Sequence, residues 1–329
     1  MTMTPIERVD CVLAGRKPDR APLSLWHHFS PEQCCGAQAV AAHVELQETY
    51  RFDFVKVMND NGYPHAERVE RIEDLAALRP LRGDEPQFER QLELIRDLRA
   101  ALSEPIYMTT TVFNAFATLR RLIKPATKTH KPPNLNAPRD EPSALIRSFI
   151  DQDANRVREA LRTIAGNLAT FAQRCLEAGA DGVYLSVRDD WVIAPGESRA
   201  LFDDLVRPCD IEILNAARQA RFNMLHVCGR PVDLHAFLDY PVHVINWADR
   251  AAGPSIEQAA AWSGPALCAG VDNLETLPAG TPAQCADQAR DALRQAGERP
   301  ILVGPGCTYD PDRVPAENLT AVCEAVRGE

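Results

Sequence analysis

Three side chains that can ligate a soft metal ion lie near two apolar runs of the sequence. His226 and Cys228 are two residues apart in the run LHVCG. Side chains alternate between the two faces of a strand, so this imidazole and this thiol are expected to point the same way. Cys307 follows another apolar run in the segment VGPGC, where the glycines and the proline indicate a tight turn.

One imidazole and two thiolates form a nitrogen–sulfur donor set that suits zinc. Three protein ligands with a fourth position open are typical of catalytic zinc sites. A buried histidine packed against two cysteines has the same local spacing and stays open as the alternative. We interpret most of the other cysteines as small structural residues, namely Cys11, Cys34, Cys35, Cys175, Cys209, Cys285 and Cys323.

The elements that position these groups follow from hydrophobic periodicity. Runs of strand length occur at 22–26, 52–58, 106–111, 182–187, 222–227, 242–247, 266–271 and 301–304. Longer stretches with helical spacing lie between them, for example at 155–179 and 198–218. Strands that alternate with helices predict a single-domain α/β fold over residues 1–329, a (β/α)8 TIM barrel. An open doubly wound sheet is the alternative, but the sequence lacks the glycine-rich phosphate turn expected of it.

Composition excludes several classes of protein. The 329 residues are 45% hydrophobic, and 36 Lys and Arg against 46 Asp and Glu give a net charge of −10. Nucleic acids and anionic membranes attract clustered positive charge, so neither is an expected partner. The sequence has no apolar run of about 18 residues and begins with a polar segment, so we expect a cytoplasmic protein.

The segment 124–142 interrupts this pattern with five prolines after the third predicted strand. A stretch this rich in proline forms neither a helix nor a central strand. Loops that follow barrel strands border the active site, so the segment is either a disordered insertion or an active-site lid.

Polar residues that follow the predicted strands are candidates for the active site, because barrel enzymes place their chemistry at the carboxyl ends of the strands. We expect substrate contacts from His28, Asn59, Asp190, Trp191 and Trp247. Asp60 and Asp272 are the candidate catalytic carboxylates. For each residue, capping of a loop or helix is the alternative role.

Over nearly its whole length the sequence resembles the uroporphyrinogen decarboxylase superfamily. The resemblance runs from PIER at 5–8 to PAENL at 315–319 and includes FDFVKVMND at 52–60 and GVDNLETL at 270–277. It implies a (β/α)8 barrel, and Asp60 falls near the place where decarboxylating members carry a catalytic aspartate. The decarboxylase branch also has an R-Q-A-G-R segment whose arginines hold substrate carboxylates. This sequence reads LWHHF at 25–29 instead.

The zinc-dependent methylcobamide:thiol methyltransferase branch resembles the sequence in its H-x-C…C motif, which matches His226, Cys228 and Cys307. This resemblance implies bound zinc and transfer of a methyl group between a corrinoid, or another donor, and a zinc-activated thiol or similar acceptor. The corrinoid-binding pattern D-x-H-x-x-G begins at Asp233 and His235 but is not completed. Any corrinoid (cobalamin) is therefore expected on a partner protein.

Two other functions stay open. A metal-free decarboxylase, a carboxy-lyase acting on a carboxylated substrate, would need an arginine-lined mouth, for which Arg188 is one candidate. A barrel that binds a corrinoid or a metal without turnover is the other. The expected partner is a small-molecule methyl donor or acceptor, and a homodimer is compatible with the sequence. No sequence motif identifies the methyl acceptor or the fourth zinc ligand.

Overall fold

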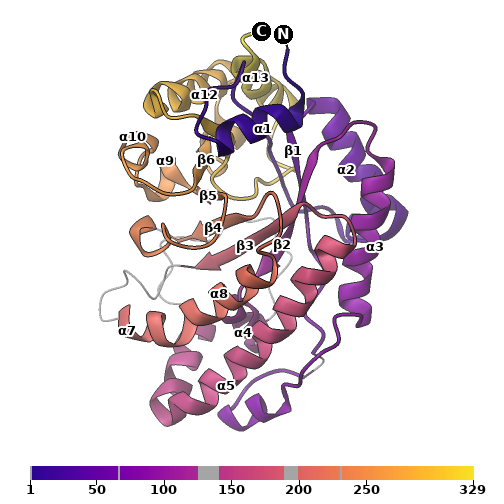
Figure 1. Cartoon of the computed structure of the whole chain (residues 1–329), viewed down its shortest axis with the longest axis vertical. Helices are drawn as coiled ribbons and strands as arrows, with labels where there is room; N and C mark the ends of the chain where they lie inside the picture. The colour runs from indigo at the N-terminus through magenta and orange to yellow at the C-terminus, as the bar shows by residue number, and fades with distance from the viewer. Residues whose placement is uncertain (1, 66, 125–140, 189–198, 230–231) are drawn as a thin grey trace.

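Seven parallel strands form the centre of the structure, a computed structural model that describes residues 2–65, 67–124, 141–188, 199–229 and 232–329. The strands are hydrogen-bonded in chain order, β1-β2-β3-β4-β5-β6-β7, and helices cover the outside of the curved sheet (Figure 1). This is an α/β fold of the TIM-barrel type. The strands are β1 (Phe54–Val57), β2 (Tyr107–Phe113), β3 (Gly182–Arg188), β4 (Met224–Cys228), β5 (Val244–Trp247), β6 (Ala266–Val271) and β7 (Ile301–Pro305).

Helices occupy most of the chain between consecutive strands. The α-helices are α1 (Pro5–Leu13), α2 (Gly36–Tyr50), α3 (Pro86–Ala101), α4 (Ala115–Ile123), α5 (Glu141–Glu177), α7 (Arg199–Leu201), α8 (Arg207–Ala216), α9 (Asp249–Ala252), α10 (Ile256–Ala260), α11 (Thr276–Ala279), α12 (Pro282–Ala296) and α13 (Ala316–Arg327). Shorter helical turns are η1 (Pro31–Gln33), η2 (Ile72–Ala77), η3 (Phe202–Val206) and η4 (Leu234–Ala236).

The helical patterns at 155–179 and 198–218 correspond to α5 and to the series α7, η3 and α8. Helix α5 is interrupted at Asp153, where the backbone leaves the helical conformation. Most of the proline-rich segment 124–142, interpreted above as an insertion or a lid, lies outside the described residues. None of the described helices combines the length and the apolar character that crossing a membrane requires.

The pleat of the strands divides the core into an outer and an inner layer. In β1, Val55 and Val57 belong to the large cluster between the sheet and the helices, whereas Phe54 packs in the barrel interior with Tyr184 and Met224. Lys56 occupies the next inward position and is 5% exposed. Alternation along the strands therefore decides which polar side chains reach the inside of the barrel.

The first predicted strand, 22–26, forms two isolated bridges instead of a strand. Leu23 bridges Val303 of β7, and His27 bridges Tyr309. The Leu23 carbonyl accepts a hydrogen bond from the Asp53 N–H at 2.8 Å, just before β1. The segment thus lies between β7 and the start of β1, but Pro22 has no N–H to extend the ladder. The expectation of eight regular strands is corrected to seven strands and this bridging segment.

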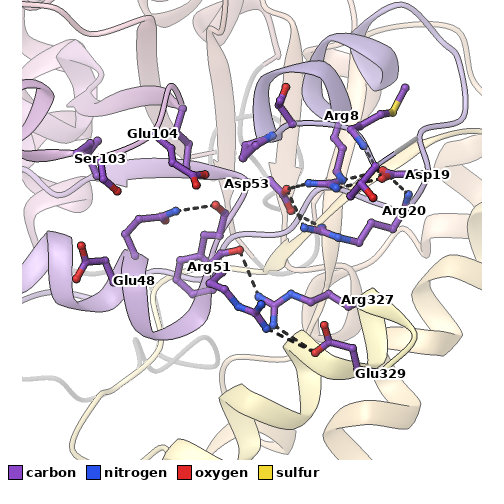
Figure 2. A pocket seen from close by; sticks show the side chains of 18 of the residues that line it. Arg8, Asp19, Arg20, Glu48, Arg51, Asp53, Ser103, Glu104, Arg327 and Glu329 are labelled. Carbon is purple, nitrogen blue, oxygen red and sulfur yellow. Dashed lines mark hydrogen bonds and ion pairs between the residues drawn. The ribbon is translucent and has the colours of Figure 1, made fainter.

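The Asp53 carboxylate anchors the bridging segment at the amino end of β1. It is completely buried and accepts hydrogen bonds from Arg8 at 3.1 Å, from Arg20 at 2.6 Å and from the Leu23 N–H at 2.9 Å. Figure 2 shows both guanidinium groups pointing at this carboxylate, with Asp19 beyond them. Helix α1, the bridging segment and β1 are therefore tied together by one buried charge.

We expect Asp53→Asn to lower the free energy of unfolding by about 3 kcal/mol, because it leaves two guanidinium groups without their buried anion. Urea denaturation followed by circular dichroism measures the change. Asp287→Asn is the matched control, since Asp287 pairs with Arg290 in solvent and should change the free energy of unfolding by less than about 0.5 kcal/mol. Equal effects of the two substitutions would contradict an anchoring role for Asp53.

Candidate metal centre

His226, Cys228 and Cys307 come together at the carboxyl ends of β4 and β7. One ligand atom from each lies within 4.8 Å of the ligand atoms of the other two. His226 is buried and the two cysteines are partly buried. The strand alternation that the sequence predicts therefore places the imidazole and the Cys228 thiol on one side, facing the turn that carries Cys307.

The amide of Asn246 in β5 fixes the tautomer of His226. Its nitrogen Nδ2 donates to the carbonyls of Cys268 at 2.8 Å and Pro305 at 3.0 Å, so its oxygen Oδ1 must be an acceptor. His226 Nδ1 lies 2.7 Å from this oxygen and therefore carries the proton. The lone pair is then on Nε2, a buried atom with no hydrogen-bond partner among the described residues. Orientation of a histidine through its second nitrogen is typical of metal sites.

Tyr184 of β3 supports the same histidine from a second direction. Its ring stacks on the imidazole, with centroids 5.5 Å apart and planes 19° from parallel. Its hydroxyl donates to Asn246 Oδ1 at 2.8 Å. Burial raises the pKa of Tyr184 well above its ordinary value, so the hydroxyl stays neutral and remains a donor.

Cys307 is positioned by a tight turn and by Asn273. The Cys307 N–H donates to Asn273 Oδ1 at 3.1 Å, and Asn273 Nδ2 donates to the Thr308 carbonyl at 2.9 Å. A Cβ at Gly306 would lie 2.6 Å from the Cα of Ala248, so only glycine fits here without a shift of the backbone. The turn expected from the sequence therefore holds the thiol at a defined place.

The two thiols are coupled. The nearby Cys307 sulfur raises the pKa of Cys228, and the nearby Cys228 thiol lowers that of Cys307, because a proton on one sulfur favours negative charge on the other. The positive charge of Lys56 lowers the pKa of Cys307 further. The pair thus loses its first proton readily and its second with difficulty. A metal ion that binds both sulfurs must displace the second proton, so binding weakens in acid.

This donor set fits zinc. The three ligand atoms are one imidazole nitrogen and two sulfurs, and Nε2 of the imidazole is buried with no hydrogen-bond partner among the described residues. Zinc prefers such ligands, and an orphaned buried acceptor is otherwise costly. Within the described ranges this group supplies three ligands, the number found at catalytic sites with an exchangeable fourth position.

Two of the other predicted site residues form a pair at the mouth of the barrel. His28 Nδ1 lies 2.7 Å from Asp60 Oδ1, and their side chains are 40% and 15% exposed. Asn59 beside them has a structural role, since its amide donates to the Thr111 carbonyl and accepts from the Asn61 N–H. The structure thus links β1 to β2 through Asn59 and leaves the His28–Asp60 pair facing the mouth.

The remaining predicted residues divide into three cases. Asp272 caps α11, because its carboxylate accepts from the N–H groups of Leu274 and Thr276 at 2.9 and 3.2 Å. Trp247 is completely buried among the outer helices, and its indole donates to the Pro254 carbonyl. The expectation that Trp247 contacts substrate is therefore wrong, since Asn246 takes the inward position and its neighbour must point outward. Asp190 and Trp191 lie outside the described residues.

The sequence reasoning missed the residues that position the ligands, Asn246, Tyr184 and Asn273. One feature of the sequence could have indicated a role for Asn246. It is an amide inside the otherwise apolar strand VINW, where a buried polar side chain needs a hydrogen-bond partner. No sequence pattern indicated a role for Asn273, apart from its position next to Asp272.

A large cavity of about 740 Å³ lies at the opposite end of the barrel (Figure 2). Its lining includes Asp53, which precedes β1, and Ile106, which precedes β2. Charged groups around it pair with each other, as in the contacts of Arg8 with Asp19 and Asp53. Amino ends of barrel strands contribute to stability more than to catalysis, so this cavity is not the candidate active site.

We expect Asn246→Ala to weaken metal binding by about 10- to 100-fold, because His226 loses the partner that fixes its tautomer. Competition for Zn²⁺ with a chromophoric chelator measures the affinity. Asn223→Ala is the matched control. Asn223 is equally buried and bonds the Ala217 carbonyl and the Val183 N–H, but at the amino end of β4. If both variants bound zinc as tightly as the wild type, Asn246 would have no role in positioning a ligand.

Known families and solved structures include relatives of this chain. No curated protein matches the sequence. A methyltransferase from Methanosarcina mazei has the same fold over 99% of both chains, with a TM-score of 0.70 and 16% identity. A B12-independent methionine synthase from Shewanella aligns with 72% of this chain and 66% of its own, with a TM-score of 0.48 and 14% identity. Residues 54–329 match the uroporphyrinogen decarboxylase (URO-D) family, and the chain belongs to that family.

Proposed function

We propose that this protein is a zinc-dependent methyltransferase that moves a methyl group between a corrinoid, or another methyl donor, and a thiol or similar acceptor. The observation that carries the proposal is the cluster of His226, Cys228 and Cys307, in which the buried Nε2 atom has no hydrogen-bond partner within the described ranges. The cluster lies at the carboxyl ends of the strands, where barrel enzymes carry their active sites. The shared fold with an archaeal methyltransferase supports the same class of reaction.

His226, Cys228 and Cys307 would hold the zinc ion. When bound, zinc supplies the positive charge that makes a thiol lose its proton at neutral pH, where a free thiol with a pKa near 8.5 is mostly protonated. Asn246 and Tyr184 keep the imidazole of His226 in one tautomer and one orientation. Asn273 holds Cys307 in place by accepting a hydrogen bond from its backbone N–H.

In the proposed reaction the acceptor sulfur uses a lone pair to form a bond to the methyl carbon. The bond between that carbon and the donor breaks, and its electron pair stays on the donor. The thiol proton leaves before the transfer. The His28–Asp60 pair at the mouth is suited to accept and pass on such a proton, because an imidazole oriented by a carboxylate is a common general base.

A corrinoid, if it is the donor, would arrive on a partner protein. The incomplete pattern at Asp233 and His235 has a structural role, since the Asp233 side chain accepts from the His235 N–H at the start of η4. The ring of His235 packs against Trp262, with centroids 4.0 Å apart. Both residues are therefore occupied by local contacts.

We expect purified protein loaded with Zn²⁺ to methylate a small thiol from methylcobalamin, and Cys307→Ser to lower this rate by at least about 100-fold, because one of three metal ligands is lost. Release of cob(I)alamin, followed by its absorbance, measures the rate. Cys34→Ser is the matched control, a partly buried thiol outside the cluster. A metal-free wild type that decarboxylates a carboxylated substrate would instead favour the decarboxylase alternative.

A further inference from the structure

The cavity at the amino end of the barrel has no part in the proposed reaction, but its volume of about 740 Å³ is typical of a small-molecule site. One face of α2 forms part of its wall. Val44, Gln47, Glu48 and Arg51 line the cavity, and their spacing of three and four residues places them on the same side of the helix. Residues 102–104, directly after α3, line it as well. The C-terminal ends of α2 and α3 therefore border the cavity.

Two carboxylates at this border are exceptions to the pairing of charges around the cavity. Glu48 lies in the last turn of α2, and Glu104 follows the end of α3 by three residues. Figure 2 shows both along one side of the view, with Ser103 nearby. Neither carboxylate has a hydrogen-bond or ion-pair partner in the described part of the chain. Because the C-terminal end of a helix carries partial negative charge, carboxylates placed there are stabilised when a cation binds beside them.

Gln47 adds a neutral acceptor on the same face of α2. Its Nε2 donates to the Phe52 carbonyl at 2.8 Å, so the other end of the amide, Oε1, is the acceptor. This atom is buried and has no hydrogen-bond partner among the described residues. A buried acceptor without a donor is costly. The N–H groups of a ligand ammonium are donors that match this oxygen and the two carboxylates.

Two guanidinium groups that line the cavity lack a close carboxylate. Arg51 and Arg327 both approach Glu329 Oε2, but the nitrogen–oxygen distances are 3.7 and 3.9 Å, longer than hydrogen bonds. Arg327 donates instead to the carbonyls of Tyr50 and Arg51 at the end of α2, which holds it next to Arg51. The Arg51 side chain is 68% exposed and therefore accessible. A ligand carboxylate can accept hydrogen bonds from both groups.

Apolar side chains complete the lining. Val44, Phe52, Leu102 and Ile106 come from α2, from the segment before β1 and from the chain between α3 and β2. They can cover the hydrocarbon part of a ligand, whose burial is favourable. The cavity thus offers unpaired negative groups, unpaired positive groups and apolar surface.

From these observations we infer that the cavity binds a small zwitterion, a molecule in which a short hydrocarbon chain joins an ammonium group to a carboxylate. The ammonium binds Glu48, Glu104 and Gln47, and the carboxylate binds Arg51 and Arg327. Arg8 and Arg20 are not ligand contacts, because Asp19 and Asp53 already occupy them. This site is separate from the candidate metal centre, which lies at the other end of the strands.

Three probes of similar length test the inference on the metal-free protein. 6-Aminohexanoate carries both charges, hexanoate carries only the carboxylate, and hexylamine carries only the ammonium. Titration of each probe followed by the melting temperature gives its apparent affinity, since a ligand that binds the folded state stabilises it. We expect the wild type to bind 6-aminohexanoate at least about fivefold more tightly than either of the others, the effect of one partly exposed ion pair.

Substitutions of exposed residues then assign the two ends of the ligand. Glu48→Gln combined with Glu104→Gln should abolish the preference for 6-aminohexanoate over hexanoate and leave the affinity for hexanoate unchanged. Arg51→Gln should weaken both carboxylates by about threefold or more and leave hexylamine unchanged. Glu45→Gln is the matched control, because Glu45 is an exposed carboxylate of the same helix that does not line the cavity.

Two results would overturn the inference. One is a wild type that binds the three probes equally, and the other is a preference for 6-aminohexanoate that survives in both the glutamate and the arginine variants. Cys307→Ser tests the location independently and should bind 6-aminohexanoate as tightly as the wild type. A loss of binding in Cys307→Ser as large as that in the glutamate variant would place the ligand at the metal centre and refute a separate site.

Discussion

One side-chain amide connects the strands that build the candidate metal centre. Asn246 of β5 donates to the backbone of β6 and β7 through Cys268 and Pro305. Its oxygen accepts from Tyr184 of β3 and His226 of β4. The two carbonyl contacts determine which end of the amide is the acceptor, and the acceptor determines which nitrogen of His226 carries the proton. The availability of Nε2 as a ligand therefore depends on the packing of five neighbouring strands.

The buried charges at the two ends of the barrel differ in how they are compensated. At the amino end, the buried Asp53 is compensated by Arg8 and Arg20, and this network joins the bridging segment to β1. At the carboxyl end, Lys56 forms no ion pair with a carboxylate of the described residues, and the acidic groups that influence its pKa are the Cys307 thiol and Asp60. The buried charge at the amino end is thus compensated by neighbouring side chains, whereas the carboxyl end carries the candidate metal ligands.

The clustering of the candidate ligands was easier to predict from the sequence than the residues that support them. His226, Cys228 and Cys307 were expected to lie together because strand alternation and a glycine-rich turn are local patterns, and the barrel topology brings strand ends together. Asn246 acts through contacts with four other strands, which no local pattern encodes. Trp247 was misassigned because the phase of alternation in a short apolar run cannot be judged from its length alone. The first expected strand, 22–26, is replaced by isolated bridges at Leu23 and His27, since the segment begins with a proline.

X-ray absorption spectroscopy of the zinc-loaded wild type is the best test of whether the histidine and the two cysteines bind zinc together. We expect about one zinc per chain with two sulfur ligands near 2.3 Å and at least one nitrogen ligand near 2.0–2.1 Å. A protein that stays metal-free when zinc is supplied, or zinc surrounded only by oxygen and nitrogen, would contradict it.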